Sequence, residues 1–176
     1  MVRKKGCWMC KEDQYRILDK EVPIERILDE HKDYYIIVPR DPLIFGHVLI
    51  VLKKHRDTLK EAILDELNLL NKQVLKWSKI LTEAFDDCKN VYLTCLNDEH
   101  HLHYHLFPIR NKEKPGCGRG HEWLGDHEKR ISKKLFENCS KAEKEARGAY
   151  IRKTVKFLKN QKRLFEEDDT HRRRSL

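Results

Sequence analysis

The sequence has no apolar run long enough to cross a bilayer. Its longest apolar stretches, such as Val48–Leu52, are far shorter than the roughly 20 residues that a membrane helix needs. Residues 1–6 are basic, but Cys7 and a charged segment follow them where a signal peptide would place its apolar core. We therefore expect a soluble protein that is not exported and has a cytoplasmic location.

Glycine and proline are scarce, and internal repeats are absent. The chain has 7 glycines and 5 prolines among 176 residues, and the only stretch rich in them covers residues 114–120. This length suits one domain with a hydrophobic core and an appended segment. We expect an α+β domain in residues 1–113, a glycine-rich loop in 114–126, a basic helical segment in 127–165 and a disordered tail in 166–176.

The spacing of apolar residues predicts the elements of the first domain. Residues 25–29 and 34–38 predict an antiparallel hairpin, residues 47–53 a third strand, and residues 91–96 and 101–109 an antiparallel pair. Between them, Thr58 and Glu61 have the spacing of a capping box. Apolar residues then recur at intervals of four and three, which predicts a helix (Ile63, Leu67, Leu70, Val74, Trp77, Leu81 and Phe85).

The C-terminal third holds most of the excess positive charge. The formal net charge is +8, and residues 132–165 contain 11 Lys and Arg against 3 Asp and Glu. Beyond Trp123, apolar spacing predicts one long helix, or two helices separated near Gly148. The positive field favours polyanions such as nucleotides and nucleic acid, or acidic proteins, although a solvated helix face would explain the charge equally well.

Three histidines alternate with apolar residues between positions 101 and 106. In an extended strand, His101, His103 and His105 share one face, and the apolar residues that alternate with them share the other. A merely polar strand face does not require three groups that titrate near neutrality, so the pattern indicates a function. One possible function is that all three imidazoles bind a single metal ion.

This pattern resembles the motif of the histidine-triad superfamily, in which two apolar residues follow His-x-His-x-His. The block Pro42–His55 is also similar to the superfamily, because it contains Gly46-His47, then an apolar strand, then Lys-Lys-His. Cys7-x-x-Cys10 resembles the zinc-binding branch of the superfamily. The resemblance covers about residues 7–110, and the basic C-terminal third lies outside it.

The resemblance implies a half-barrel-like antiparallel sheet of about five strands packed with helices, usually in a homodimer. It also implies a nucleotide hydrolase or nucleotidyltransferase that acts on dinucleoside polyphosphates or nucleoside phosphoramidates. His103 would attack the α-phosphorus and form a covalent nucleotidyl-histidine, while a backbone carbonyl holds its other ring nitrogen. His105 would donate to phosphate oxygens. His47 would line the pocket, although a histidine satisfied in the core explains it equally well.

Two departures from the superfamily affect the expected substrate site. Residues 97–100 replace a longer glycine-rich loop, which suggests a different leaving group, and Asn97 is a candidate contact to the nucleotide. The position of the superfamily's ribose-binding aspartate falls at Pro39 in this chain. Asp41 is therefore the candidate replacement for that aspartate.

The cysteines are expected to be reduced, because the chain shows no secretory signal. A Cys-x-x-Cys pair can supply two ligands of a tetrahedral structural zinc site, and the resemblance assigns Cys7, Cys10, His55 and His101 as the four ligands. A redox pair is the competing interpretation. The remaining cysteines are expected to be small buried hydrophobes (Cys88, Cys95 and Cys139).

Two other functions stay open at this point. One is a zinc-stabilised module that binds nucleic acid or a protein through the basic segment, with the histidine triad catalytically idle. The other is a metallohydrolase with zinc on the triad itself.

Overall fold

The computed structural model describes residues 4, 6–10, 17–19, 22–23, 25–95, 100–110 and 141–174. Asn97, the expected loop in 114–126 and the first part of the expected helical segment lie outside the described residues. Among the described residues, neither long helix contains a stretch that is long and apolar enough to span a membrane.

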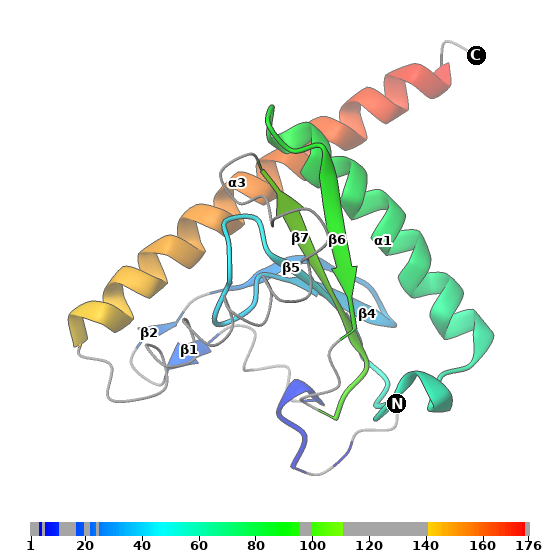
Figure 1. The fold of residues 1–176 in the computed structure, drawn as a ribbon, viewed down its shortest axis with the longest axis vertical. Coiled ribbons are helices and arrows are strands. Elements are labelled where there is room, and N and C mark those ends of the chain that lie inside the picture. The colour runs from blue at the N-terminus through cyan, green and yellow to red at the C-terminus, as the bar shows by residue number, and fades with distance from the viewer. Residues whose placement is uncertain are drawn as a thin grey trace.

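The centre of the fold is a five-stranded antiparallel sheet with the strand order β3-β4-β5-β7-β6 (Figure 1). Its strands are β3 (Ile27–Glu30), β4 (Tyr34–Ile37), β5 (Val48–Leu52), β6 (Asn90–Thr94) and β7 (His103–Ile109). A separate small pair is formed by β1 (Ile17–Asp19) and β2 (Val22–Pro23). The predicted hairpin, the third strand and the antiparallel pair are confirmed, and so is the α+β class.

Helix α1 (Leu64–Ala84) covers one face of this sheet and buries Leu70, Trp77, Ile80 and Leu81. The predicted capping box is wrong. Thr58 makes no side-chain cap; it precedes a 3₁₀ helix (Leu59–Glu61), and the Glu61 carboxylate instead accepts the backbone N–H of Asp57 at 2.9 Å. The α-helix begins later, where the Glu66 carboxylate accepts the backbone N–H of Ile63 at 3.1 Å.

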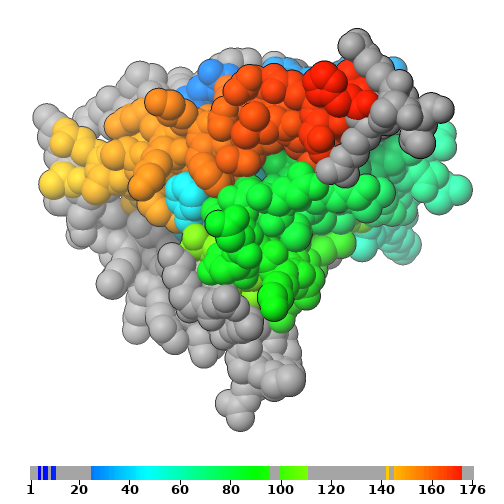
Figure 2. Space-filling view, turned by 90° about the horizontal axis from the view of Figure 1, so that it is seen from above, coloured from blue at the N-terminus to red at the C-terminus, as the bar shows by residue number. Residues whose placement is uncertain are grey.

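Helix α3 (Lys141–Arg174) is a single helix that continues through Gly148. The expected disordered tail is wrong for residues 166–174, which are helical. Glu166 explains part of this, because it binds Lys76 of α1 at 2.7 Å and so ties the end of α3 to the domain. Figure 1 shows the two helices converging, and Figure 2 shows α3 lying along one side of the molecule.

The two faces of the sheet have different coverings. Leu102, Tyr104 and Leu106 belong to the main core with α1 and with Ile151, Val155 and Leu158 of α3. The opposite face carries a second apolar cluster that includes Leu49, Val51 and Met9 of the N-terminal 3₁₀ helix (Trp8–Cys10). His103 pairs with Val51 and His105 with Leu49 across the antiparallel ladder, so both histidines lie on this second face.

Candidate functional site

The three alternating histidines are buried, with exposed fractions of 0% for His101, 1% for His103 and 9% for His105. The rings of His103 and His105 are neighbours, with centroids 4.7 Å apart. Burial removes imidazoles from water, so each ring nitrogen needs a defined partner. Those partners fix where the ring protons lie.

His103 has its proton on Nδ1. This atom lies 2.6 Å from the backbone carbonyl oxygen of His101, and a carbonyl oxygen only accepts hydrogen bonds. Nδ1–H therefore donates, and in the neutral ring the lone pair is on Nε2. The resemblance predicted a backbone carbonyl in this role, and the structure identifies it as that of His101.

His47 and His105 form a second ordered pair. The backbone N–H of Leu43 donates to Nδ1 of His47 at 3.3 Å, which places the proton of that ring on Nε2. His47 Nε2–H then donates to Nδ1 of His105 at 3.0 Å, so the neutral His105 ring carries its proton on Nε2. This Nε2 atom is buried and has no hydrogen-bond partner among the described residues. The Leu43 amide thus sets the tautomers of both His47 and His105. His105 is left with an Nε2–H donor that no described residue accepts.

The environment keeps these rings neutral. Burial, followed by the positive charge that His103 would carry, lowers the pKa of His105 to about 3. Burial, with smaller effects of His105 and His103, lowers the pKa of His47 well below its ordinary value. A lone pair beside an N–H donor is what attack on a phosphorus centre requires.

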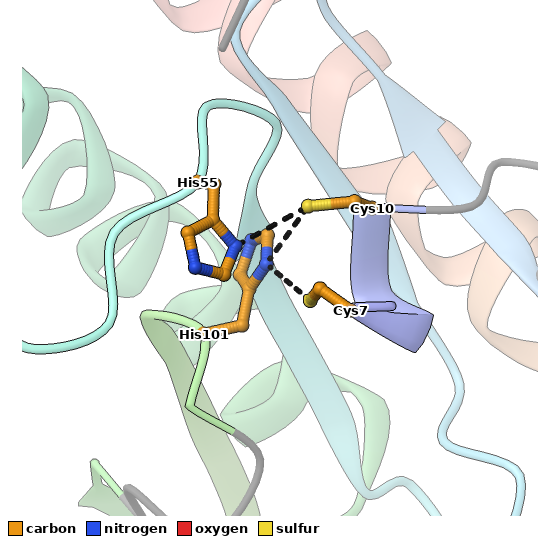
Figure 3. A group of neighbouring side chains, drawn as sticks. All are labelled: Cys7, Cys10, His55 and His101. Carbon is orange, nitrogen blue, oxygen red and sulfur yellow. Dashed lines mark hydrogen bonds between the residues drawn. The ribbon is translucent and has the colours of Figure 1, made fainter. Parts of the chain in front are cut away.

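The four predicted metal ligands lie together at the edge of this region (Figure 3). Their ligand atoms are all within 4.8 Å of one another (Cys7, Cys10, His55 and His101). Nδ1 of His101 lies 3.3 Å from the sulfur of Cys7 and 3.6 Å from that of Cys10, and Nδ1 of His55 lies 3.3 Å from the sulfur of Cys10. Zinc bonds of about 2.3 Å to sulfur and about 2.0 Å to nitrogen would place tetrahedral S and N ligands about 3.5 Å apart, so the separations fit.

The partners of the two ligand histidines also fit a metal. His101 Nε2–H donates to the carbonyl oxygen of Leu52 at 2.6 Å, and His55 Nε2–H donates to the carboxylate of Asp57 at 2.7 Å. Both rings therefore direct the Nδ1 lone pair toward the cysteines, as in sites where a second hydrogen bond orients the metal-binding imidazole. Lys4 in turn binds Asp57 at 3.0 Å. Burial lowers the pKa of His101 to about 4, which keeps its lone pair available.

Asp41 lies on the loop that precedes β5, beside α3. Its Oδ1 is 3.0 Å from Nη1 of Arg147, and their side chains are 19% and 10% exposed. Burial raises the pKa of Asp41, while the positive charges of Arg147, Arg40 and Arg26 oppose that rise. The structure thus groups His47 with His103 and His105 and places Asp41 against α3, while Asn97 lies outside the described residues.

Sequence reasoning missed three contributors to these sites. Asp57 had a usable signal, because it stands two residues after His55. The Leu43 amide had none, since every residue except proline carries such a group. Arg147 had none either, because its partner is distant in the sequence.

Solved structures with a similar fold are histidine-triad proteins. A HIT family protein from Bacillus anthracis is 18% identical, covers 76% of this chain and 99% of that chain, and superposes with a TM-score of 0.52. A Zn-bound histidine triad family protein from Mycobacterium smegmatis is 18% identical, covers 88% and 96% of the two chains, and has a TM-score of 0.49. A hypothetical histidine triad nucleotide-binding protein from Sulfolobus tokodaii is 22% identical, with coverage of 87% and 94% and a TM-score of 0.48.

The fold is therefore of the histidine-triad type, as the resemblance predicted. A search of the curated proteins finds no match. The family model described as "Protein similar to CwfJ C-terminal" matches residues 1–115, and the chain belongs to this family. Helix α3 lies beyond the matched residues.

Proposed function

We propose that this protein is a nucleotide hydrolase or nucleotidyltransferase in which Nε2 of His103 attacks the α-phosphorus of its substrate. The observation that carries this proposal is the set of hydrogen bonds that fixes the tautomers of the neighbouring His103 and His105 rings. His103 holds a lone pair on Nε2, and the neighbouring His105 holds a buried N–H that no described residue accepts. The proposed nucleophile and the proposed phosphate-binding donor would thus be neighbours on one face of β7.

The reaction would proceed in two steps. The Nε2 lone pair of His103 forms a bond to the α-phosphorus, while the bond from phosphorus to the leaving group breaks and its electron pair departs with that group. The His101 carbonyl stabilises the positive ring through Nδ1–H, and His105 donates to a phosphate oxygen. Water then displaces the histidine and releases the nucleoside monophosphate, or another acceptor takes the nucleotidyl group.

The substrate would be a dinucleoside polyphosphate or a nucleoside phosphoramidate. His47 acts through His105, whose tautomer it fixes. Asn97 and Asp41 are the proposed contacts to the nucleotide. Asp41 would use the part of its carboxylate that Arg147 leaves accessible.

We also propose that Cys7, Cys10, His55 and His101 hold a structural zinc ion. The ion would supply a four-ligand brace that joins the N-terminal 3₁₀ helix to the start of β7, as closed zinc sites do. The orientation of both histidines by Leu52 and Asp57 supports this assignment. With all four positions taken by protein, the site takes no part in the chemical step.

The proposal is tested by trapping the covalent intermediate. The protein is incubated with a slowly reacting nucleoside phosphoramidate, and the labelled peptide is located by mass spectrometry. We expect the label on His103, and we expect His103→Ala to abolish release of the monophosphate while zinc content stays at one ion per chain. His31→Ala is the matched control, because His31 is 42% exposed and lies in the turn between β3 and β4.

Three results would contradict the proposal. Wild-type turnover by His103→Ala would exclude this nucleophile. Loss of the metal in His103→Ala together with normal turnover of Cys7→Ser would instead favour zinc on the triad, and salt-dependent binding of nucleic acid without turnover of any nucleotide would favour an idle triad.

The exposed face of α3 supports a polyanionic partner. Arg152, Lys156, Lys159 and Arg163 are all exposed and recur at intervals of four, three and four, which aligns them along one side of the helix. We propose that this side of α3 contacts nucleic acid. Binding should then weaken steeply with salt, and Lys156→Glu should weaken it further. The homodimer and the cytoplasmic location stay predictions, which sedimentation and cell imaging can test.

A further inference from the structure

We propose that Arg147 of α3 is a positioning residue for the histidine site, because it holds the loop whose backbone amide sets the tautomers of His47 and His105. This inference rests on the proposed function. It gives a role to a helix that the family match does not include. The structural basis is a chain of contacts from α3 to the buried N–H of His105.

The loop formed by residues 40–47 carries the first contact of that chain. Its Leu43 N–H donates to Nδ1 of His47 at 3.3 Å, which is long for a hydrogen bond. A small displacement of the loop would therefore break it. His47 would then no longer be held with its proton on Nε2, and Nδ1 of His105 would lose its donor.

Helix α3 contacts this loop at two points. At one point Arg147 Nη1 lies 3.0 Å from Asp41 Oδ1, in an ion pair that is largely shielded from water. At the other, the ring of Phe45 packs against Tyr150 and Phe157, with centroid distances of 5.9 and 5.4 Å. The two contacted residues, Asp41 and Phe45, flank Leu43 in the sequence. Helix α3 therefore determines where the Leu43 amide lies.

The two contacts differ in how they are connected to the rest of the domain. The aromatic contacts are continuous with the main core, since Phe45 and Phe157 both pack on it. The ion pair is local, and Asp41 Oδ1 has no hydrogen-bond partner among the described residues. Loss of Arg147 would leave the largely shielded carboxylate of Asp41 without its ion-pair partner, and such a carboxylate moves toward water. The loop would move with it, while the core stays packed.

The test compares Arg147→Ala with Arg147→Lys, which restores the charge, and with Lys153→Ala, which removes one exposed charge from the same helix. Ring protonation is read directly from ¹⁵N-histidine NMR without substrate. We expect Arg147→Ala to convert His105 from the Nε2–H form to a mixture of tautomers. We expect kcat to fall about tenfold or more, and KM to rise as well because Asp41 is also a proposed contact to the nucleotide. Arg147→Lys should recover most of both signals, and Lys153→Ala should match the wild type.

Asp41→Asn supplies a second variant in case Arg147→Ala fails to fold. It keeps the shape of the side chain and removes its charge, so positioning predicts the same tautomer mixture and a lower kcat. If Asp41 contacted only the nucleotide and did not hold the loop, Asp41→Asn would raise KM and leave the His105 spectrum unchanged, and that unchanged spectrum would overturn the inference. An unchanged His105 spectrum in folded Arg147→Ala would also overturn it. The spectra are recorded without turnover, so they test Arg147 even if no nucleotide proves to be a substrate.

Discussion

Replacing Gly46 with alanine should destabilise the fold and disturb the histidine site that begins at the next residue. Gly46 has φ of +94°, where a side chain is strained, and alanine there costs about 1–2 kcal/mol relative to glycine. A Cβ atom at this position would also lie 2.8 Å from Cγ of Pro108 and 2.9 Å from Cε2 of Phe85. Both neighbours belong to rings that cannot bend away, so relief of the overlap costs about 1–3 kcal/mol more.

The total loss of about 2–5 kcal/mol is large against the 5–15 kcal/mol or so by which most domains are stable. Urea unfolding, followed by tryptophan fluorescence with zinc in excess, measures it. Gly6→Ala is the matched control, because Gly6 has the same φ of +94° but no atom within 4 Å of its added Cβ. The difference between the two variants isolates the overlap. If they unfold within about 0.5 kcal/mol of each other, the steric reasoning is refuted.

Three further predictions follow from the same structure. Cys10→Ser should lose zinc and unfold at a lower temperature, while Cys88→Ser should keep one zinc per chain by atomic absorption. The free energy of unfolding should fall as the pH drops below 6.5. In this range His105 is protonated in the unfolded chain but stays neutral in the folded protein, where its pKa is about 3. His105 contributes about 1.4 kcal/mol per pH unit to that slope, and His105→Gln should reduce the slope by this amount while the contribution of His47, whose pKa is also lowered, remains, as urea midpoints at pH 7 and 5 would show. Glu66→Gln should cost about 1 kcal/mol at pH 7, since it weakens two 2.9 Å bonds from Arg56, and the loss should vanish near the Glu66 pKa of about 2.

The sheet and α1 were predictable because apolar periodicity marks many of the residues that are buried, although Ile63 of the predicted stripe is exposed. Leu70, Trp77 and Leu81 were expected on one helical face and are fully buried there. The start of α1 was not predictable from the spacing of Thr58 and Glu61. The Glu61 carboxylate binds the amide of Asp57 and not that of Thr58, and a local competition of that kind leaves no periodic signal.

The end of α3 was mispredicted for a different reason. Residues 166–174 are highly charged, and charge without apolar periodicity suggests a tail. Part of the order comes from the ion pair between Glu166 and Lys76, which are far apart in the sequence, and part from the pairing of Arg163 with Glu167 at 2.9 Å. Only the second of these contacts is local enough to be found in the sequence.

In the candidate site, the positions of the rings were predictable and their protonation was not. Alternation along a strand places His103 and His105 on one face in any register. Which nitrogen carries the proton depends on backbone groups such as the Leu43 amide and the His101 carbonyl. The sequence offers equivalent groups at almost every residue, so only the folded chain selects among them.

His101 belongs to two centres through two separable parts of one residue. Its ring is a candidate metal ligand and can be exchanged by mutation. Its carbonyl, which accepts the hydrogen bond of His103 Nδ1–H, is main chain and survives any substitution that preserves the strand. Replacing this side chain would therefore remove the proposed zinc brace without removing the group that orients the proposed nucleophile. At a temperature where such a protein stays folded, any turnover that remains would measure the proposed chemistry of His103 without the zinc site.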